Sequence, residues 1–460
     1  MNLKQYKQVY FIGIGGIGMS ALARYFIDLG LVVSGYDKTP SDITQSLEKE
    51  GIPIHYSDDV DLIPATFLEK QKSRLVVFTP AIPAEHKELN YFKEKGYTVC
   101  KRAEILGLIS QNKFTIAVAG THGKTTTAWM IAHLLKSCKI DCYALLGGIS
   151  SNYHTNYLSA EDPACNLMVV EADEFDRSFL SLKPNIAIIT SIDPDHLDIY
   201  GNYSELLKGF QEFSNGIKPN GKLIKSDTAI KINPGKLKNI NTYGLGGNYD
   251  FNGINIRVSE GIYLFDILSR VAFIEDIKLQ VAGRHNILNA IAAYAVVNEF
   301  IQDNEKIKAA FESFKGVKRR FEFIIKKPDC IFVDDYAHHP GELLFTIQTL
   351  QELFPGKPIT GVFQPHLYSR TRDLLKDFAK VLSELDHIIL LDIYPAREIP
   401  IDGINSELLL SIINTDSKCV ASKDQLLQLL SEDENEIFVT LGAGDINRLV
   451  EPIKQILLKR

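Results

Sequence analysis

The sequence has no pair of cysteines at a spacing typical of metal binding or redox chemistry. Its six cysteines are scattered along 460 residues, and none stands in a Cys-x-x-Cys motif. A chain of this size needs no disulfides for stability, so we expect reduced thiols and a cytoplasmic protein. The sequence also has no Gly-x-Ser-x-Gly motif and no Cys/His zinc spacing, which argues against a serine-hydrolase elbow and a structural zinc site.

Long hydrophobic runs and long basic blocks are missing as well. Apolar runs such as Leu145–Ile149 and Ile388–Leu391 are far too short to span a bilayer. The first residues lead into a glycine-rich strand instead of a signal-peptide core, so we expect no membrane insertion. A net charge of −7 without a basic block argues against nucleic acid as the main partner.

What the sequence does contain is an alternation of strand-like and helix-like segments. This βαβ alternation predicts an α/β fold with parallel sheets and helices on their faces. Because 460 residues exceed one hydrophobic core, we expect three α/β domains, 1–111, 112–315 and 316–460. The predicted strands are Val9–Ile14, Leu31–Tyr36, Leu75–Thr79, Thr115–Val118, Leu167–Glu171, Ile186–Thr190, a β-like region from Tyr243 to Gln280, Cys330–Asp334, Ile359–Phe363, Ile388–Asp392 and Ile437–Leu441. The predicted helices are Met19–Leu29, Ala103–Ile109, Trp129–Lys136 and Ile287–Phe300.

The most informative segment follows the strand Thr115–Val118 and reads Gly120-Thr-His-Gly-Lys-Thr-Thr126. A glycine turn between a strand and a helix directs backbone N–H groups and the positive helix end at one point, which suits phosphate oxygens. Lys124 adds a positive charge for the terminal phosphates, and a hydroxyl of one of the next two threonines can reach Mg²⁺. The segment lacks the first glycine of the usual P-loop pattern, so we interpret it as a shortened variant.

A second glycine cluster, Gly13-Ile-Gly-Gly-Ile-Gly18, lies near the N-terminus after the first predicted strand. Such a loop lets the backbone approach a pyrophosphate at the end of a helix. By itself the motif fits NAD, FAD or a nucleotide sugar. Asp37 follows the next strand, about where a ribose-binding acid stands in a dinucleotide domain, so the residues leave an NAD-dependent dehydrogenase open.

Acidic and histidine residues follow two strands of the central segment. Glu171 comes directly after Leu167–Val170, where a carboxylate can hold a Mg²⁺ ion that bridges two phosphates. For Asp173, Glu174 and Asp176 two interpretations stay open, a solvated loop and a ligand role. His196 follows the strand 186–190, and its expected position opposite Glu171 favours a metal site.

Further candidates lie toward the C-terminus. Asn286 and Asn289 are three apart on one predicted helix face, where their amides could read an adenine edge. An arginine of the Arg319-Arg320 pair could neutralise charge in phosphoryl transfer if a closing domain delivered it. Two third-segment strands are followed by Asp334-Asp-Tyr-Ala-His-His-Pro340 and Gln364-Pro-His-Leu-Tyr-Ser-Arg-Thr-Arg372. The first could hold ribose hydroxyls and an amine, and the second supplies Arg370 and Arg372 for a carboxylate.

In their order along the chain, the loop around Lys124, Glu171, His196, the run His285-Asn-x-x-Asn289 and Arg320 resemble the Mur ligase family of ATP-dependent amide-bond-forming enzymes. The resemblance spans essentially the whole chain. It implies that MgATP phosphorylates the lactyl carboxylate of UDP-N-acetylmuramate and that the amine of L-alanine attacks the acyl phosphate. It also implies a Rossmann-like UDP-binding domain, a P-loop-type central ATPase domain and a Rossmann-like C-terminal domain.

The resemblance implies roles for residues in each of the three domains. The catalytic residues are Lys124, Glu171, His196, Arg320 and His338. The ATP-binding residues are Gly120, Thr121, His122, Gly123, Lys124, Thr125, Thr126, His285, Asn286, Asn289, Arg320 and Asp335. The metal ligands are Thr125, Glu171 and His196, the UDP-sugar site is formed by Gly15, Gly16, Ile17, Gly18 and Asp37, and the amino-acid site by His338, His366 and Arg370. Leu367 stands where many relatives carry an arginine.

Three alternatives stand beside this hypothesis. A recycling ligase of the same family would attach a whole tripeptide to the same sugar nucleotide. An NAD-dependent dehydrogenase would explain Gly13–Gly18 and Asp37 but gives Lys124 and the arginine pair no role. A nucleotide-gated binding module would show no turnover. We expect a monomer or a weak homodimer.

Overall fold

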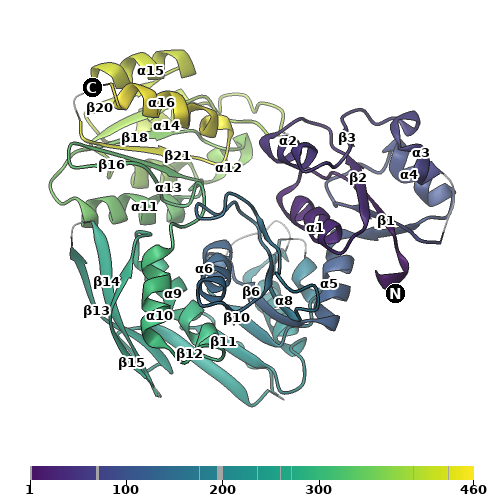
Figure 1. The fold of residues 1–460 in the computed structure, drawn as a ribbon. Helices are drawn as coiled ribbons and strands as arrows, with labels where there is room; N and C mark the ends of the chain where they lie inside the picture. The colour runs from purple at the N-terminus through teal and green to yellow at the C-terminus, as the bar shows by residue number, and fades with distance from the viewer. Residues whose placement is uncertain are drawn as a thin grey trace. The chain divides into compact units, whose positions relative to one another are not determined.

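The computed structural model describes residues 3–68, 72–175, 177–193, 200–235, 237–259, 261–270, 272–396, 398–433 and 435–459. These residues form three β-sheets with helices packed on them (Figure 1). The chain divides into two compact units. The first contains Met1–Asn255, Phe265–Ile277 and His285–Phe314, and the second contains Ile256–Leu264, Lys278–Arg284 and Lys315–Arg460.

The first sheet is entirely parallel and has the order β3-β2-β1-β4-β5. Its strands are β1 (Gln8–Ile12), β2 (Val32–Tyr36), β3 (Ile54–His55), β4 (Arg74–Phe78) and β5 (Thr98–Lys101). Its helices are α1 (Ile17–Asp28), α2 (Asp42–Lys49), α3 (Ala65–Leu68), α4 (Lys87–Glu94) and α5 (Arg102–Asn112).

The central strand β1 is buried on both faces, as its unbroken apolar run indicates. Because side chains alternate along a strand, Val9 and Phe11 pack in the core that contains α1 and α5. Tyr10 and Ile12 pack in the other core, with Phe67 of α3 and with α4. The loop that follows β1 lies at the carboxyl end of the sheet, where open α/β sheets bind ligands.

The second sheet has the order β15-β14-β13-β12-β11-β10-β6-β9-β7-β8, and its central strands are parallel. The strands are β6 (Phe114–Ala119), β7 (Tyr143–Leu145), β8 (Tyr157–Leu158), β9 (Leu167–Glu171), β10 (Ile186–Ile189), β11 (Lys222–Ser226), β12 (Asn239–Leu245), β13 (Phe251–Ser259), β14 (Ile262–Ser269) and β15 (Phe273–Leu279). The helices are α6 (Lys124–Ser137), α8 (Tyr203–Asn215), α9 (Arg284–Val297) and α10 (Asn304–Ser313).

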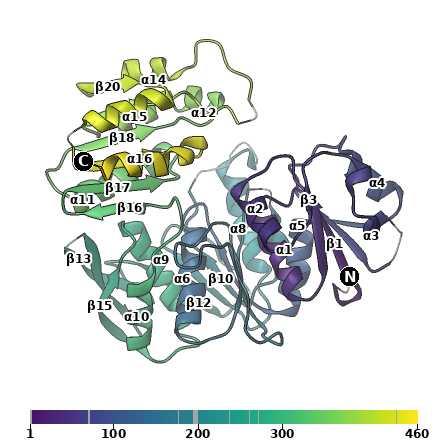
Figure 2. The same cartoon turned by 45° about the horizontal axis from the view of Figure 1, so that its top comes forward.

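The third sheet has the order β16-β17-β21-β18-β19-β20, and it is parallel except for the edge strand β16. Helices lie on both of its faces (Figure 2). The strands are β16 (Glu322–Lys327), β17 (Cys330–Asp335), β18 (Ile359–Phe363), β19 (His387–Leu390), β20 (Ser417–Val420) and β21 (Ile437–Leu441). The helices are α11 (Pro340–Leu353), α12 (Tyr368–Asp373), α13 (Leu375–Leu382), α14 (Ser406–Ile412), α15 (Lys423–Glu432) and α16 (Val450–Leu457).

The predicted fold class is confirmed: three α/β domains, with a mainly parallel sheet in the centre. The predicted helix boundaries differ from the observed ones most at α6, which begins at Lys124 and not near Trp129. The three threonines after Lys124 are β-branched and favour helix only weakly, but all three are buried in the core, and packing decides their conformation.

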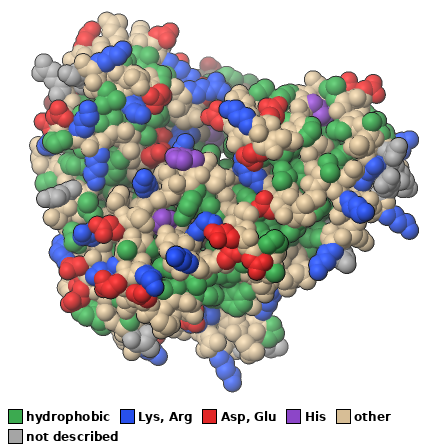
Figure 3. Space-filling view, viewed as in Figure 1, with side chains coloured by type: hydrophobic (Ala, Val, Ile, Leu, Met, Phe, Trp, Pro, Cys, Tyr) green, Lys and Arg blue, Asp and Glu red, His purple; other side chains and the backbone are tan. Residues whose placement is uncertain are grey.

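The surface charge and the hydropathy of the helices agree with what the amino-acid composition indicates. Lys and Arg side chains are interspersed with Asp and Glu side chains across the face shown in Figure 3. Among the described residues, no helix combines the length and the hydropathy that crossing a membrane requires. All six cysteines are free thiols.

Candidate active site

The loop between β6 and α6 can be built only with glycine at its first position. Gly120 has a φ of +137°, and a Cβ atom there would lie 2.0 Å from Thr190 Oγ1 and 2.8 Å from the Ser191 nitrogen. The loop therefore packs directly against the end of β10. Further hydrogen bonds fix it there, since the His122 N–H donates to Ser191 Oγ over 2.9 Å and the Thr121 and Ser191 hydroxyls are also 2.9 Å apart.

The N-terminus of α6 is open to an anion. Its N-cap is Gly123, with a left-handed φ of +79°, and no side chain caps the helix. The first turn also contains no acidic residue. Backbone N–H groups at such an end lack partners within the helix and carry partial positive charge, which attracts phosphate.

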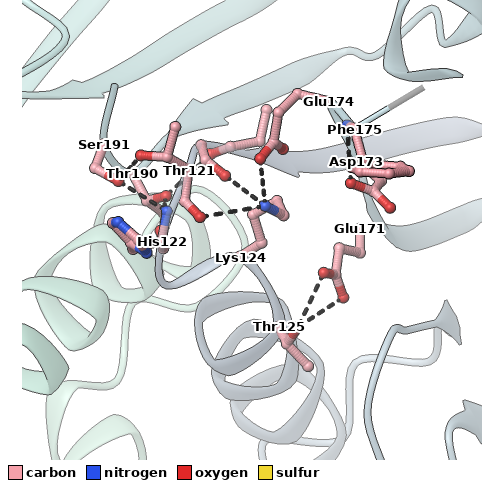
Figure 4. Close-up of polar contacts among 12 residues, drawn as sticks. Thr121, His122, Lys124, Thr125, Glu171, Asp173, Glu174, Phe175, Thr190 and Ser191 are labelled. Atoms are coloured by element: carbon pink, nitrogen blue, oxygen red, sulfur yellow. Dashed lines mark hydrogen bonds and ion pairs between the residues drawn. The ribbon is translucent and has the colours of Figure 1, made fainter. Parts of the chain in front are cut away.

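Lys124 turns back over this loop toward a buried carboxylate (Figure 4). Its Nζ donates to the Gly120 carbonyl over 2.7 Å and to Glu174 Oε1 over 2.8 Å. The Glu174 side chain is fully buried, which rules out the solvated loop, one of the two interpretations given for this residue. Burial alone would lower the pKa of Lys124, but the carboxylates around it, Glu174 first, raise the pKa and keep the ammonium charged.

Two of the predicted metal ligands lie in contact. Thr125 Oγ1 donates to both oxygens of Glu171 over 2.9 Å (Figure 4). Glu171 Oε2 also accepts the Gly147 N–H over 2.8 Å, which orients the carboxylate at the end of β9. A Cβ at Gly147 would lie 2.3 Å from Glu171 Oε2, so this close approach requires glycine.

The third predicted ligand, His196, lies outside the described residues, and so does Asp176. Within the part of the chain that the structure describes, no three His, Cys, Asp or Glu side chains form a group that could hold a metal ion. The described donors at this point are thus a hydroxyl and one carboxylate, a hard oxygen set of the kind Mg²⁺ takes together with water and phosphate.

The asparagines of α9 lie against the same loop. Asn289 Nδ2 donates to Asn286 Oδ1 over 3.0 Å, so the two side chains share one face as predicted. A Cβ at Gly123 would meet Asn289 Oδ1 at 2.5 Å, which places this amide beside the start of α6. Helix α9 begins at Arg284, so Asn286 lies inside the helix and is not its N-cap. His285 is half-buried beside them.

The first glycine cluster forms the predicted turn between β1 and α1. The Gly15 N–H donates to Asp37 Oδ2 over 2.7 Å, and a Cβ on Gly15 would meet that carboxylate at 2.8 Å. Helix α1 has Gly16 as N-cap, with no side-chain cap and no acid in its first turn. The loop can thus receive an anion at the helix end, with Asp37 holding one side of the turn.

A cavity of about 280 Å³ connects this loop with Glu171. One end is lined by Gly16, Ile17 and Gly18, and the other by Gly147 and Glu171. Both ends belong to the first compact unit.

Arg102, the first residue of α5, also lines the cavity. Its guanidinium lies over the start of α1, since a Cβ on Gly18 would be 3.0 Å from Arg102 Nη1. Sequence analysis missed Arg102 and Gly147. The sequence did show a charged residue next to a predicted helix end at Arg102. It did not show that Arg102 lies against Gly18, which is 84 residues away in sequence.

In the second unit, both arginines of the predicted pair contact one aromatic ring. The guanidinium carbons of Arg319 and Arg320 lie 5.0 and 5.1 Å from the centre of the Tyr336 ring, within cation–π range. Arg319 also donates to Asp334 Oδ2 over 3.4 Å. The Arg319 side chain is therefore held in place by both Tyr336 and Asp334. The Arg320 guanidinium contacts the Tyr336 ring.

Asp335 stands at the end of β17, close to Arg320. Its carboxylate accepts hydrogen bonds from the Thr346 hydroxyl and from the Ala337 N–H. Burial raises the pKa of Asp335 to about 6, although the hydrogen bond from Thr346 and the charge of Arg320 oppose the shift.

The three residues predicted to bind the amino acid lie together. The rings of His338 and His366 are 6.1 Å apart, and Arg370 Nη1 lies 3.5 Å from His366 Nδ1. Burial, Arg370 and His338 lower the pKa of His366 to about 4, and burial lowers the pKa of His338 as well. Both imidazoles are therefore neutral at pH 7, beside one positive guanidinium.

Leu367 adopts a conformation that is rare for this residue type. Its φ is +72° and its ψ is 134°, and its N–H donates to the Tyr394 carbonyl. Backbone strain of this kind is most often found at binding sites. It places the start of α12, and with it Arg370, beside His366.

Family models match the chain in three consecutive parts. Residues 8–114 match the Mur ligase family catalytic domain, residues 118–297 the Mur ligase middle domain, and residues 319–444 the Mur ligase glutamate ligase domain. The chain belongs to the Mur ligase family, an ATP-dependent class of ligases.

Individual relatives match over the full length. The UDP-N-acetylmuramate–L-alanine ligase of Christiangramia forsetii is 47% identical, and that of Flavobacterium psychrophilum is 49% identical, each over 99% of both chains. The crystal structure of the UDP-N-acetylmuramate–alanine ligase of Thermotoga maritima has a TM-score of 0.81 at 28% identity and covers 98% of each chain.

Proposed function

We propose that this protein joins L-alanine to the lactyl carboxylate of UDP-N-acetylmuramate and converts ATP to ADP and phosphate. Relatives that are 47–49% identical over 99% of both chains carry this name, which supports the same reaction here. The product is UDP-N-acetylmuramoyl-L-alanine, a peptidoglycan precursor.

The observation that carries the proposal is the cavity between the glycine loop and Glu171. A nucleotide-sugar diphosphate at the start of α1 would leave the sugar to run along the cavity toward Glu171. The loop around Lys124 and the Thr125–Glu171 pair lie at that end. A carboxylate on the sugar would then meet the terminal phosphate of ATP at this end of the cavity.

The chemistry has two steps. First, a lactyl carboxylate oxygen attacks the γ-phosphorus, the bond to the β-γ bridging oxygen breaks, and ADP leaves. Next, the neutral amine of L-alanine attacks the acyl carbon and loses a proton, and phosphate leaves with one former carboxylate oxygen. The amide keeps the other oxygen, so atoms and charges balance.

We assign the nucleotide to the loop of the central domain. Lys124 and the loop N–H groups would bind the β- and γ-phosphates, while His285, Asn286 and Asn289 would lie near adenine. Thr125 and Glu171 would hold Mg²⁺, together with His196, and the hydroxyl–carboxylate pair fits that hard cation. When bound, Mg²⁺ neutralises charge on the phosphates.

The second unit would supply the remaining groups. Arg320 would neutralise charge on the transferred phosphate, and Asp335 would bind the ribose. His338 and His366, whose rings lie 6.1 Å apart, would lie beside the incoming amino acid. Arg370 would bind the alanine carboxylate.

The sugar nucleotide would lie on the first domain. Gly15, Gly16, Ile17 and Gly18 would bind the diphosphate, and Asp37 would hold the turn. Arg102 adds a positive charge to this end of the cavity and is proposed here as a further diphosphate ligand.

We also propose the limits of the three domains, the cellular location and the oligomeric state. The limits are 1–111, 112–315 and 316–460, and the three consecutive family matches are compatible with them. A cytoplasmic location is supported by the free thiols and by the use of ATP. A monomer or weak homodimer is the expected state, which sedimentation can decide.

A phosphate-release assay tests the function. UDP-N-acetylmuramate is crossed with L-alanine, glycine, L-serine and the stem tripeptide, and we expect the fastest release with L-alanine. Faster release with the tripeptide would favour the recycling ligase. Membership of the Mur ligase family speaks against the NAD-dependent dehydrogenase, and NADH titration checks this directly.

A further inference from the structure

Glu174 is the buried partner of the loop lysine, and the functional assignment above gives it no role. It follows β9 by three residues, its side chain is 0% exposed, and its Oε1 lies 2.8 Å from Lys124 Nζ. The Tyr200 hydroxyl donates to its backbone carbonyl over 2.8 Å, which ties the segment into the core. A fully buried carboxylate is costly unless it has a charged partner, and Lys124 is that partner.

The hydrogen bonds of the ammonium group show what phosphate binding requires. An ammonium group has three N–H donors. Three acceptors lie within hydrogen-bonding distance of Lys124 Nζ: the Gly120 carbonyl at 2.7 Å, Glu174 at 2.8 Å and the Thr121 carbonyl at 3.5 Å. A phosphate oxygen that accepts a hydrogen bond from Lys124 therefore competes with these acceptors for the same N–H groups.

The three acceptors differ in charge. The two carbonyls are neutral and belong to the loop itself, while Glu174 carries a negative charge that competes directly with a phosphate. Moving the ammonium group toward a phosphate weakens a buried ion pair. This cost makes the binding of the nucleotide less favourable. The cost falls on phosphate contacts and not on adenine contacts.

We propose that Glu174 is a positioning residue that competes with the nucleotide phosphates for Lys124 and thereby limits the affinity for ATP. The proposal rests on the proposed function, since it assumes that ATP phosphates bind at this loop. Its consequence is unusual for a residue beside an active site: removing the charge strengthens substrate binding.

The test compares Glu174→Gln with the wild-type protein. Glutamine keeps the size and an acceptor oxygen but removes the negative charge. We expect about tenfold tighter binding of MgATP in calorimetry, which is about 1.4 kcal/mol, because the charged competitor for Lys124 is removed. Adenosine, which has no phosphate, is expected to bind both proteins equally.

A matched control is Asp173→Asn, which removes the same charge one residue earlier, at a side chain for which no hydrogen bond to Lys124 is present. We expect a clearly smaller change in MgATP affinity. Glu174→Asp provides a second variant if the glutamine variant does not fold. Its shorter side chain weakens the ion pair, and an intermediate affinity is expected.

Unchanged or weaker MgATP binding by a folded Glu174 variant would overturn the proposal. Failure of the wild-type protein to bind MgATP would overturn the proposed function and, with it, this inference. Wild-type binding and turnover without tighter binding by the variant would overturn the inference alone.

Discussion

At the scale of single residues, Lys124 is the side chain on which the proposed phosphoryl transfer depends most. We expect Lys124→Ala to lower ligation by about 10³-fold or more, because a fixed positive charge at the transferred phosphate is lost. Binding of UDP-N-acetylmuramate should be unchanged, since Gly13–Gly18 belong to a different sheet. Phosphate release and equilibrium binding of the sugar nucleotide measure the two effects.

The matched control is Lys136→Ala, at the other end of the same helix, where the lysine is partly exposed and lies 3.7 Å from Glu161. It should ligate at the wild-type rate. If Lys124→Ala lost sugar-nucleotide binding while remaining folded, the division of the two substrates between two sheets would be wrong.

Glu88 allows a second residue-scale prediction, on stability. Its side chain is fully buried beside the Tyr10 hydroxyl, which donates to it over 2.8 Å, and beside His55. Burial raises the pKa of Glu88 from 4.5 to about 7. As pH rises from about 4.5 to 7, the unfolded chain loses this proton while the folded chain keeps it, so stability falls by up to about 3 kcal/mol.

Glu88→Gln should remove this dependence and make the protein more stable than wild type above pH 7. Urea unfolding at several pH values measures the difference between the two proteins. Glu94→Gln, at an exposed position of the same helix α4, is the control and should leave the pH dependence as it is. Parallel stability curves for Glu88→Gln and wild type would contradict the prediction.

Individual residues also show what a sequence can predict about this site. Thr125 is the second residue of α6, after the loop that follows β6, and Glu171 ends the neighbouring parallel strand β9. Both residues were predicted as partners of one ion, and they are in contact. The burial of Glu174 was not predictable, because the sequence alone does not show whether an acidic residue in a loop faces solvent or the protein interior. The predicted roles of His196 and of the other site residues stay predictions.

At the scale of secondary-structure elements, helix α1 is connected to the second sheet by side-chain hydrogen bonds. Asn156, directly before β8, donates through Nδ2 to the Ile17 carbonyl and to Ser20 Oγ, the latter over 2.9 Å. Tyr157 donates to Asp28 near the end of the same helix over 2.6 Å. These bonds fix the start of α1, where the diphosphate is proposed to bind, relative to the sheet that carries Glu171.

We expect Asn156→Ala to raise KM for UDP-N-acetylmuramate several-fold, at about the same KM for ATP, because the diphosphate end of the cavity loses its alignment. Stability should fall by about 1–3 kcal/mol, since buried polar partners lose a hydrogen bond. Asn405→Ala removes the N-cap of α14 in the second unit and is the control for lost stability, at about 1 kcal/mol. An equal rise in both KM values would contradict the prediction.

Elements differed in how far the sequence revealed them. Strands with continuous apolar runs, such as β1, β9 and β18, were predicted to within two residues. The edge strands β3 and β8 have two residues each and show no periodicity, so they were not predicted. Helix α6 was predicted too short. Its first turn contains three threonines, which favour helix weakly, and only their packing in the core makes this segment helical.

At the scale of the whole molecule, the proposed reaction requires both compact units. Lys124 and Glu171 belong to the first, and Arg320 and Asp335 to the second. We therefore expect nucleotide binding to bring the units together through the segment near Lys315. Small-angle scattering with a non-hydrolysable ATP analogue should show a smaller radius of gyration than without it, and Arg320→Ala should reduce the change. Identical curves would contradict domain closure.

The most direct test of the reaction follows one atom. UDP-N-acetylmuramate with both lactyl carboxylate oxygens replaced by ¹⁸O is incubated with ATP, Mg²⁺, L-alanine and the enzyme, and the released phosphate is analysed by mass spectrometry. An acyl phosphate intermediate requires one ¹⁸O atom in each phosphate released and one in the new amide. Phosphate without ¹⁸O would show that the carboxylate is not phosphorylated, and the proposed chemistry would be wrong.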